Sequence, residues 1–355
     1  MPDSLSPIEV LSTKICPWLN DPLHMLDTIR RDGKFSHGWI LAGPAGVGKI
    51  NLALVVARRL LSQSIELPGH LDSATALAAM DARHEPSDHH QDLHWIFPDE
   101  GKYQIAVGKP PNPLPNTIRA LIYDLNLTSH TSNNKVAIIE PAEAMNGSAM
   151  NALLKTLEEP TPDTYILLVS HQPTLLPATI RSRCQILPLS APPREEALPW
   201  LSSGGQETES NCADYLSFVG GAPLAHTKEN ISKIIKINNE LKSIFNVNYI
   251  NKMNPYEVAA KFKDDQALVL EWLTAGLEVA IRERFRGVGL SGSGRAGTSW
   301  LPAGWEKITK KSLFNQLDTV RKLRKQIDAG VKINTDLGLG LVLQDFLPTR
   351  AERII

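Results

Sequence analysis

Residues 38–50 read Gly-Trp-Ile-Leu-Ala-Gly-Pro-Ala-Gly-Val-Gly-Lys-Ile, an apolar strand-like run followed by a glycine-rich turn and the start of a helix. This spacing is that of a P-loop, in which backbone N–H groups surround phosphates and a lysine reaches the β- and γ-phosphates. The hydroxyl that would ligate Mg²⁺ is replaced by Ile50, whose alkyl chain cannot coordinate a hard cation. The sequence therefore predicts a degenerate P-loop that binds ATP weakly if at all, and a glycine-rich turn without a ligand is the alternative. The glycines and the lysine of this turn are Gly43, Gly46, Gly48 and Lys49.

The first 190 residues alternate between strand-like and helical stretches, which predicts a parallel sheet covered by helices. Helices are expected at 49–61 and 148–159, because apolar residues recur there at helical spacing. Residues 63–108 are rich in Pro, His, Asp and Ser, and we expect an irregular insertion outside the sheet. The strand-like runs are Gly38–Ala42, Lys135–Glu140 and Tyr165–Ser170.

A P-loop ATPase also needs acidic groups where a neighbouring strand ends, and the candidate strand here is Lys135–Glu140. A P-loop ATPase needs one carboxylate there to hold Mg²⁺ and another group to polarise the attacking water. Glu140 could in principle supply the first, but Pro141 has no acid-base chemistry, and we expect Glu143 to be a solvated carboxylate at a helix start. Together with Ile50, this degenerate Walker B position predicts that the chain does not hydrolyse ATP.

Composition excludes several classes of protein. The formal net charge is −1, from 37 basic and 38 acidic residues, which argues against a polybasic nucleic-acid-binding protein. The three cysteines, Cys16, Cys184 and Cys212, form neither a disulfide framework nor a zinc-binding pair. No secretory signal or membrane-spanning run is evident, so we expect a cytoplasmic protein.

The second half of the chain is predicted to be helical. Apolar residues share one face in 265–285 and again in 312–328. Between them, 287–299 is a Gly/Ser-rich loop. Basic residues dominate 307–325. On an amphipathic helix they could form either a solvent-exposed face or a surface that binds DNA phosphates.

Three motifs together resemble a known family: His37–Lys49, Asn151–Pro160 (NALLKTLEEP) and Leu176–Cys184, which ends in Ser-Arg-Cys. The chain resembles the AAA+ subunits of bacterial DNA polymerase III clamp loaders. Members of the gamma/tau type keep the P-loop threonine and an Asp-Glu pair, whereas Ile50 and Pro141 are typical of the delta-prime type.

The resemblance implies an α/β fold in three parts. A AAA+ RecA-like P-loop domain would span 1–190, with a parallel sheet and flanking helices. A small helical lid would span 191–232, and an all-helical collar for oligomerisation would span 233–355.

The resemblance also implies a role for Ser182, Arg183 and Cys184. In clamp loaders the arginine of this SRC motif reaches the γ-phosphate of ATP bound by the neighbouring subunit. A guanidinium suits that task because it is a permanent charge with a rigid fork of donors. A surface ion pair is the alternative for Arg183, and we expect Cys184 to be a small buried hydrophobe. Ser170 or His171 falls where AAA+ proteins place a polar sensor residue.

The family often carries a four-cysteine zinc module after the P-loop helix, and this chain has no cysteine between Cys16 and Cys184. Structural zinc is therefore not expected. A histidine-carboxylate site in the insertion is the alternative, although its spacing fits no known ligand pattern. Its residues would be His84, His89, His90 and His94 with Asp81, Asp88 and Asp92.

The resemblance implies a non-hydrolysing, delta-prime-like subunit of a hetero-oligomer that loads the sliding clamp on primed DNA. Its partners would be the gamma/tau and delta subunits, the clamp and, through the complex, primer-template DNA, with no membrane involved. An active ATPase motor using Lys49 and Glu140 is the alternative from another class, and Ile50 argues against it. A DNA-binding AAA+ protein unconnected with replication is a third possibility, which the NALLKTLEEP and SRC motifs disfavour.

Overall fold

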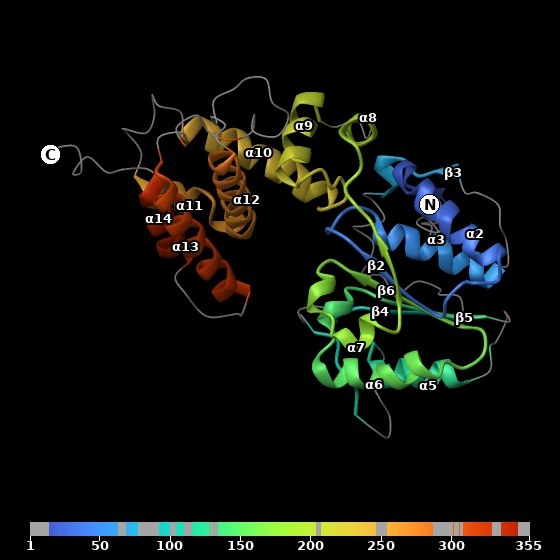
Figure 1. The fold of residues 1–355 in the computed structure, drawn as a ribbon. Helices are drawn as coiled ribbons and strands as arrows, with labels where there is room; N and C mark the ends of the chain where they lie inside the picture. Colours follow the sequence, from blue (N-terminus) through green and yellow to red (C-terminus); the bar gives the residue numbers. More distant parts are fainter. Residues whose placement is uncertain are drawn as a thin grey trace, which may run out of the picture. The chain divides into compact units, whose positions relative to one another are not determined.

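The structure is a computed structural model of the 355-residue chain (Figure 1). The chain divides into two compact units, one made of Met1–Gly205 with Ala222–Thr227 and the other of Gln206–Gly221 with Lys228–Ile355. The segment Ala222–Thr227 thus belongs to the first unit although its neighbours along the chain belong to the second. The residues that the structure describes are 14–62, 69–76, 92–99, 104–109, 116–127, 129, 134–203, 207–245, 254–286, 301, 305, 308–328 and 335–346.

A five-stranded parallel sheet forms the centre of the first unit. Its strands are β2 (Gly38–Ala42), β4 (Leu93–Ile96), β5 (Lys135–Ile139), β6 (Thr164–Ser170) and β7 (Gln185–Pro188). They lie in the order β4-β5-β6-β2-β7, and every neighbouring pair is parallel. Such a sheet is covered on both faces, which explains why β2 and β5 are buried along their whole length and mostly apolar. The parallel sheet predicted from the sequence is confirmed.

Helices cover both faces of this sheet (Figure 1). They are α2 (Asn20–Arg31), α3 (Lys49–Ser62), α5 (Ile118–Asn126), α6 (Gly147–Glu158) and α7 (Ala178–Arg181), while α8 (Arg194–Ser202) follows the last strand. α2 and α3 lie on one side, while α5, α6 and α7 lie on the other. Leu121 of α5 and Leu153 of α6 belong to one buried core with Ile40, Ile139 and Leu168 of the sheet.

Part of the predicted insertion belongs to the sheet, so the prediction for 63–108 is wrong there. β4 pairs with β5 from Leu93↔Val136 to Ile96↔Ile139. β4 was not evident in the sequence because it is a short edge strand, where only its end residues are buried and polar residues are tolerated. Ile105 also pairs with Met145 and lies in the core. The remaining parts, 63–68, 77–91 and 100–103, lie outside the described residues.

Two short strands, one before and one after the P-loop helix in the chain, form a small second sheet beside that helix. β1 (Lys14–Ile15) pairs in parallel with β3 (Gly69–His70). The 3₁₀ helix η1 (Pro17–Leu19) follows β1. Trp18 in η1 packs edge-on against Trp200 of α8, with ring centroids 5.0 Å apart. Residues 14–19 are therefore anchored against β3 and α8.

The second unit is helical, as the sequence predicts. Its helices are α9 (Glu209–Phe218), α10 (Lys228–Phe245), α11 (Pro255–Lys261), α12 (Gln266–Phe285), α13 (Lys310–Asp328) and α14 (Thr335–Phe346). Trp272 of α12 packs edge-on against Trp305, and both are buried. Gly276 leaves room for the second indole, because a Cβ there would lie 2.9 Å from a ring carbon of Trp305.

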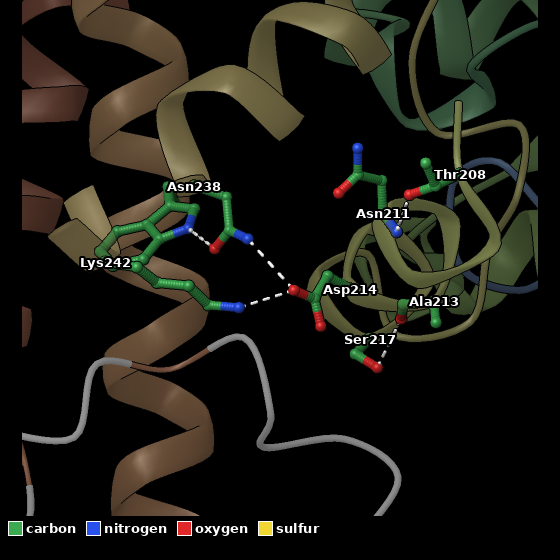
Figure 2. Close-up of polar contacts among 8 residues, drawn as sticks. Thr208, Asn211, Ala213, Asp214, Ser217, Asn238 and Lys242 are labelled. Atoms are coloured by element: carbon green, nitrogen blue, oxygen red, sulfur yellow. Dashed lines mark hydrogen bonds and ion pairs between the residues drawn. The ribbon is translucent and has the colours of Figure 1, made fainter. Parts of the chain in front are cut away.

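A polar network joins three helices of the second unit (Figure 2). The Asp214 carboxylate on α9 accepts from Lys242 Nζ at 2.6 Å and from Asn238 Nδ2 at 3.4 Å. Asn238 in turn accepts from the Trp272 indole N–H at 3.0 Å. These contacts tie α9 to α10 and α12. The predicted boundaries at residues 190 and 232 stay a prediction.

Among the described residues, no helix is both long and apolar enough to cross a membrane.

A buried ion pair holds α2 against α3. Asp27 and Arg59 contact each other, and their side chains are 8% and 6% exposed. We expect Asp27→Ala to lower the free energy of unfolding by about 3–5 kcal/mol, because it removes the carboxylate that contacts a buried guanidinium. Urea unfolding of the purified chain measures this. Asp124→Ala is the control, since Asp124 is 44% exposed and lies 3.8 Å from His94, and its effect should stay below about 1 kcal/mol. Equal losses in both variants would contradict the prediction.

Candidate nucleotide site and arginine finger

The P-loop connects β2 to α3 at the carboxyl edge of the sheet. The Gly43 N–H donates to the Ser170 carbonyl at the end of β6, at 3.2 Å. Gly46 and Gly48 adopt φ values of +78° and +91°, which residues with a side chain rarely adopt. The backbone therefore has the form that the glycine pattern predicts.

The chain's own segment 222–227 lies directly on this loop. The Leu224 N–H donates to the Gly46 carbonyl at 2.9 Å. A Cβ on Gly46 would lie only 2.3 Å from the Ala225 nitrogen, so the two backbones are in close contact. The Trp18 indole N–H donates to the Val47 carbonyl at 3.0 Å. The loop is thus bound by two segments of the chain, around residues 18 and 224.

Lys49 is folded back onto the loop that should present it to a phosphate. Its side chain is buried, and its Nζ donates to the Gly43 carbonyl at 2.8 Å and to the Pro44 carbonyl at 2.5 Å. Burial lowers the pKa of Lys49 to about 8, although the charges of Glu140 and Glu143 act in the opposite direction. The ammonium is engaged by backbone carbonyls.

The two residues after Lys49 offer no ligand for a metal ion. Ile50 is 5% exposed and packs in the core. Asn51 is committed elsewhere, because its Oδ1 accepts from the Cys16 N–H at 2.9 Å and its Nδ2 donates to the Lys14 carbonyl at 3.0 Å. Asn51 therefore holds the first strand against α3.

The end of β5 departs from the expectation in one residue. Glu140 is buried, and the following Glu140–Pro141 peptide bond is cis. Glu143 is not the solvated carboxylate that we expected. Its Oε1 accepts from the backbone N–H groups of His171 and Gln172 at 2.8 and 3.1 Å. The prediction is wrong because the backbone N–H groups that follow β6 donate hydrogen bonds to this carboxylate and hold it against the end of the strand.

The proposed sensor position lies beside this carboxylate. Ser170 is fully buried at the end of β6, and among the described residues its hydroxyl has no hydrogen-bond partner. The backbone of His171 contacts Glu143. A sensor role for either residue stays a prediction.

Arg183 lies at the opposite edge of the sheet. It precedes β7, which runs parallel to β2 with Trp39 opposite Gln185 and Ala42 opposite Pro188. Arg183 is therefore beside Gly38, where β2 begins, whereas the P-loop follows the end of β2. Five residues of strand at about 3.3 Å each separate the two edges by roughly 15 Å.

The guanidinium of Arg183 is held by its own subunit. Nη2 lies 2.5 Å from Glu158 Oε1, and Nη1 donates to the Thr179 carbonyl at 2.8 Å. The ion pair that the sequence leaves open as the alternative for Arg183 is thus present. Ser182 is exposed, while Cys184 is buried as predicted, and burial raises the pKa of its thiol to about 11.

No group of three or more potential metal ligands occurs within the described part of the chain. His94 lies on β4, with Nδ1 3.8 Å from Asp124, and Asp92 is buried nearby in sequence. The other members of the suggested cluster, His84, His89 and His90 with Asp81 and Asp88, lie outside the described residues. The absence of structural zinc stays a prediction.

A parallel sheet with a P-loop after β2 and an arginine before β7 defines the first unit as a AAA+ P-loop domain. Residues 19–193 match the family model described as "DNA polymerase III, delta subunit". This match covers just under half of the chain and, with the relatives below, confirms the resemblance to DNA polymerase III delta-prime subunits that is seen in the sequence.

Similar proteins agree with this assignment. DNA polymerase III subunit delta' of Pseudomonas aeruginosa is 36% identical over 190 residues, which are 53% of this chain and 54% of that protein. The Haemophilus influenzae subunit of the same name is 28% identical over 77% of this chain and 79% of its own length. The match to the first of these relatives therefore spans about half of its length.

Among solved structures, a DNA polymerase III, gamma subunit-related protein from Thermotoga maritima superposes with a TM-score of 0.45 at 19% identity. That superposition covers 90% of this chain and 98% of the other.

Two contacts of this site could not be found from the sequence. Leu224 lies far along the chain from the P-loop, and an Ala-Pro-Leu-Ala stretch carries no pattern that indicates a backbone contact. Glu158 offers a weak signal, since a glutamate at the end of a helix opposes the helix dipole. That signal does not indicate Arg183 as its partner.

Lys49 should make folding stability depend on pH. Its folded pKa of about 8 lies below its ordinary value of 10.5, so between these values the unfolded chain binds more protons than the folded chain. Stability then rises with pH there, at up to about 1.4 kcal/mol per unit. In Lys49→Met this contribution is absent.

Unfolding of both proteins by urea from pH 7 to 10.5 provides the measurement, because other lysines titrate equally in each. Relative to wild type, Lys49→Met should be most stable below pH 8 and lose this advantage as the pH rises. A difference independent of pH would contradict a lowered pKa for Lys49.

Proposed function

We propose that this chain is a non-hydrolysing subunit of a DNA polymerase III clamp loader. It helps to load the sliding clamp on primed DNA and supplies Arg183 to the ATP site of a neighbouring subunit. The observation that carries the proposal is the placement of Arg183 and the P-loop at opposite edges of one sheet. An arginine placed there cannot serve its own P-loop, so a phosphate that it binds must belong to another chain.

The state of the P-loop supports the absence of hydrolysis. Lys49 is engaged by loop carbonyls, and Leu224 and Ala225 pack on Gly46. Ile50 and Pro141 remove the Mg²⁺ ligand and the group that would activate water. A nucleotide would have to displace protein contacts and would gain no metal.

The partners follow from the same assignment. The chain would assemble with gamma/tau and delta subunits as part of a DNA-directed DNA polymerase holoenzyme, and would act on the clamp and primer-template DNA through that complex. It would need neither zinc nor a bound nucleotide of its own. Within this chain, the three structural parts would be the P-loop domain, the lid and the collar.

The purified chain alone should release no phosphate from ATP above the level of a Lys49→Ala control. Restoring the metal ligand with Ile50→Thr should not create activity, because Pro141 still leaves the attacking water unactivated. Steady-state phosphate release with Mg²⁺ measures both. Release by the wild-type chain that Lys49→Ala abolishes would show a working P-loop and contradict the proposal.

Arg183→Ala should leave the chain folded and the complex assembled, because an exposed ion pair contributes little stability. DNA-stimulated ATP hydrolysis and clamp loading by the reconstituted complex should fall. Arginine fingers of GTPases are worth roughly 10³–10⁵ in rate, but the loss here is limited to the share of one ATP site. Arg183→Lys should also be impaired, since an ammonium lacks the donor fork.

Arg181→Ala is the matched control, because Arg181 is an exposed arginine two residues earlier, at the end of α7. It should leave both activities at the wild-type level. If complexes with Arg183→Ala hydrolysed ATP and loaded clamps like wild type, the role in trans would be wrong.

A further inference from the structure

The two most distinctive motifs of the sequence meet at the amino edge of the sheet. The segment NALLKTLEEP supplies the C-terminal part of α6, which ends at Glu158, and the Ser-Arg-Cys motif directly precedes β7. Both ends pack against Gly38. A Cβ on Gly38 would lie 3.1 Å from Cys184 Sγ, 3.4 Å from the Arg183 carbonyl and 3.4 Å from Leu157 Cδ2.

The end of α6 is fixed in this place by a further contact. His37 Nε2 lies 2.9 Å from the Leu157 carbonyl, so the residue before Gly38 is hydrogen-bonded to the last turn of the helix. Glu158 is therefore presented by a helix that is anchored to the same strand start as Arg183. The ion pair between them joins two well-positioned elements.

The identity of residue 158 is unfavourable for the helix itself. The last turn of a helix carries a partial negative charge, so a glutamate there is disfavoured and a basic residue is preferred. Glu158 is the last residue of α6, and its side chain is 47% exposed. A glutamate that is unfavourable for its own helix and brings no evident gain in stability points to a role in function.

We propose that Glu158 is a positioning residue that holds the Arg183 guanidinium in place for a phosphate of the neighbouring subunit. This rests on the proposed function of Arg183. One edge of the guanidinium is bound by Glu158 and the Thr179 carbonyl. A guanidinium has five N–H donors in a rigid fork, so it can keep these contacts and still bind a phosphate.

Positioning is favoured over restraint for an energetic reason. The pair is partly exposed, at 33% for Arg183 and 47% for Glu158, and such pairs are too weak to withhold an arginine from a phosphate. Holding the side chain beforehand avoids the loss of its rotamer freedom when it binds. The neighbour's ATP site therefore gains a finger that is already oriented.

The test compares Glu158→Ala, Glu158→Gln, Arg183→Ala and the double variant Glu158→Ala/Arg183→Ala in the reconstituted complex. The readouts are DNA-stimulated ATP hydrolysis, clamp loading and the unfolding temperature of the purified chain. Glu159→Ala is the matched control, because Glu159 is the adjacent exposed glutamate and makes no ion pair among the described residues.

We expect Glu158→Ala to lower the Arg183-dependent rate by about 3- to 30-fold, the upper value being the whole rotamer entropy of an arginine expressed as a rate. Glu158→Gln should retain part of this rate, since its amide oxygen can still accept a hydrogen bond. The double variant should be no slower than Arg183→Ala, and the unfolding temperature should change by less than about 2 °C.

Wild-type rates for Glu158→Ala, with a loss for Arg183→Ala, would overturn the positioning role and leave the proposed function intact. A faster Glu158→Ala complex would also overturn it, because Glu158 would then restrain the arginine. An additional loss in the double variant would show that Glu158 acts independently of Arg183. Wild-type rates for Arg183→Ala would refute the proposed function, and with it this inference.

Discussion

The parallel pairing of β2 with β7 is the constraint on which the rest of the site depends. Because both strands run the same way, the P-loop that follows β2 and the arginine that precedes β7 lie at opposite edges of the sheet. One domain can therefore carry a nucleotide-binding edge and an arginine-presenting edge that do not meet within the chain. Under the proposed function, the loss of catalytic groups at the carboxyl edge would leave the amino edge intact.

The residues at the two edges of the sheet differ in how many contacts they make with the rest of the chain. At the carboxyl edge, Lys49 and Gly46 are bound by backbone groups, and Glu143 satisfies the N–H groups after β6. At the amino edge, Arg183 stays one-third exposed and is held by a single carboxylate and a carbonyl. The groups at the carboxyl edge are therefore bound within the protein, whereas Arg183 at the amino edge stays accessible.

Much of this could be predicted from the sequence, because glycine spacing, apolar runs and a missing hydroxyl at residue 50 each have a direct structural meaning. β4 could not, since an edge strand that contains His94 and Trp95 lacks the apolar signature of a central one. The contacts of Leu224 with Gly46 and of Glu143 with His171 link residues far apart in the chain, and nothing in either local sequence indicates its partner. Glu158 lies within the NALLKTLEEP motif, but its pairing with Arg183 depends on where α6 ends relative to β7.

The most direct test of this account is a structure of the assembled clamp loader with a non-hydrolysable ATP analogue, in which the distance from Arg183 to the nearest γ-phosphate is measured. The account predicts that the guanidinium lies within about 3.2 Å of a γ-phosphate oxygen bound by the neighbouring subunit. It also predicts that the P-loop of this chain keeps the Leu224–Gly46 hydrogen bond and holds no nucleotide. A nucleotide with Mg²⁺ at Lys49, or an Arg183 out of reach of every γ-phosphate, would contradict it.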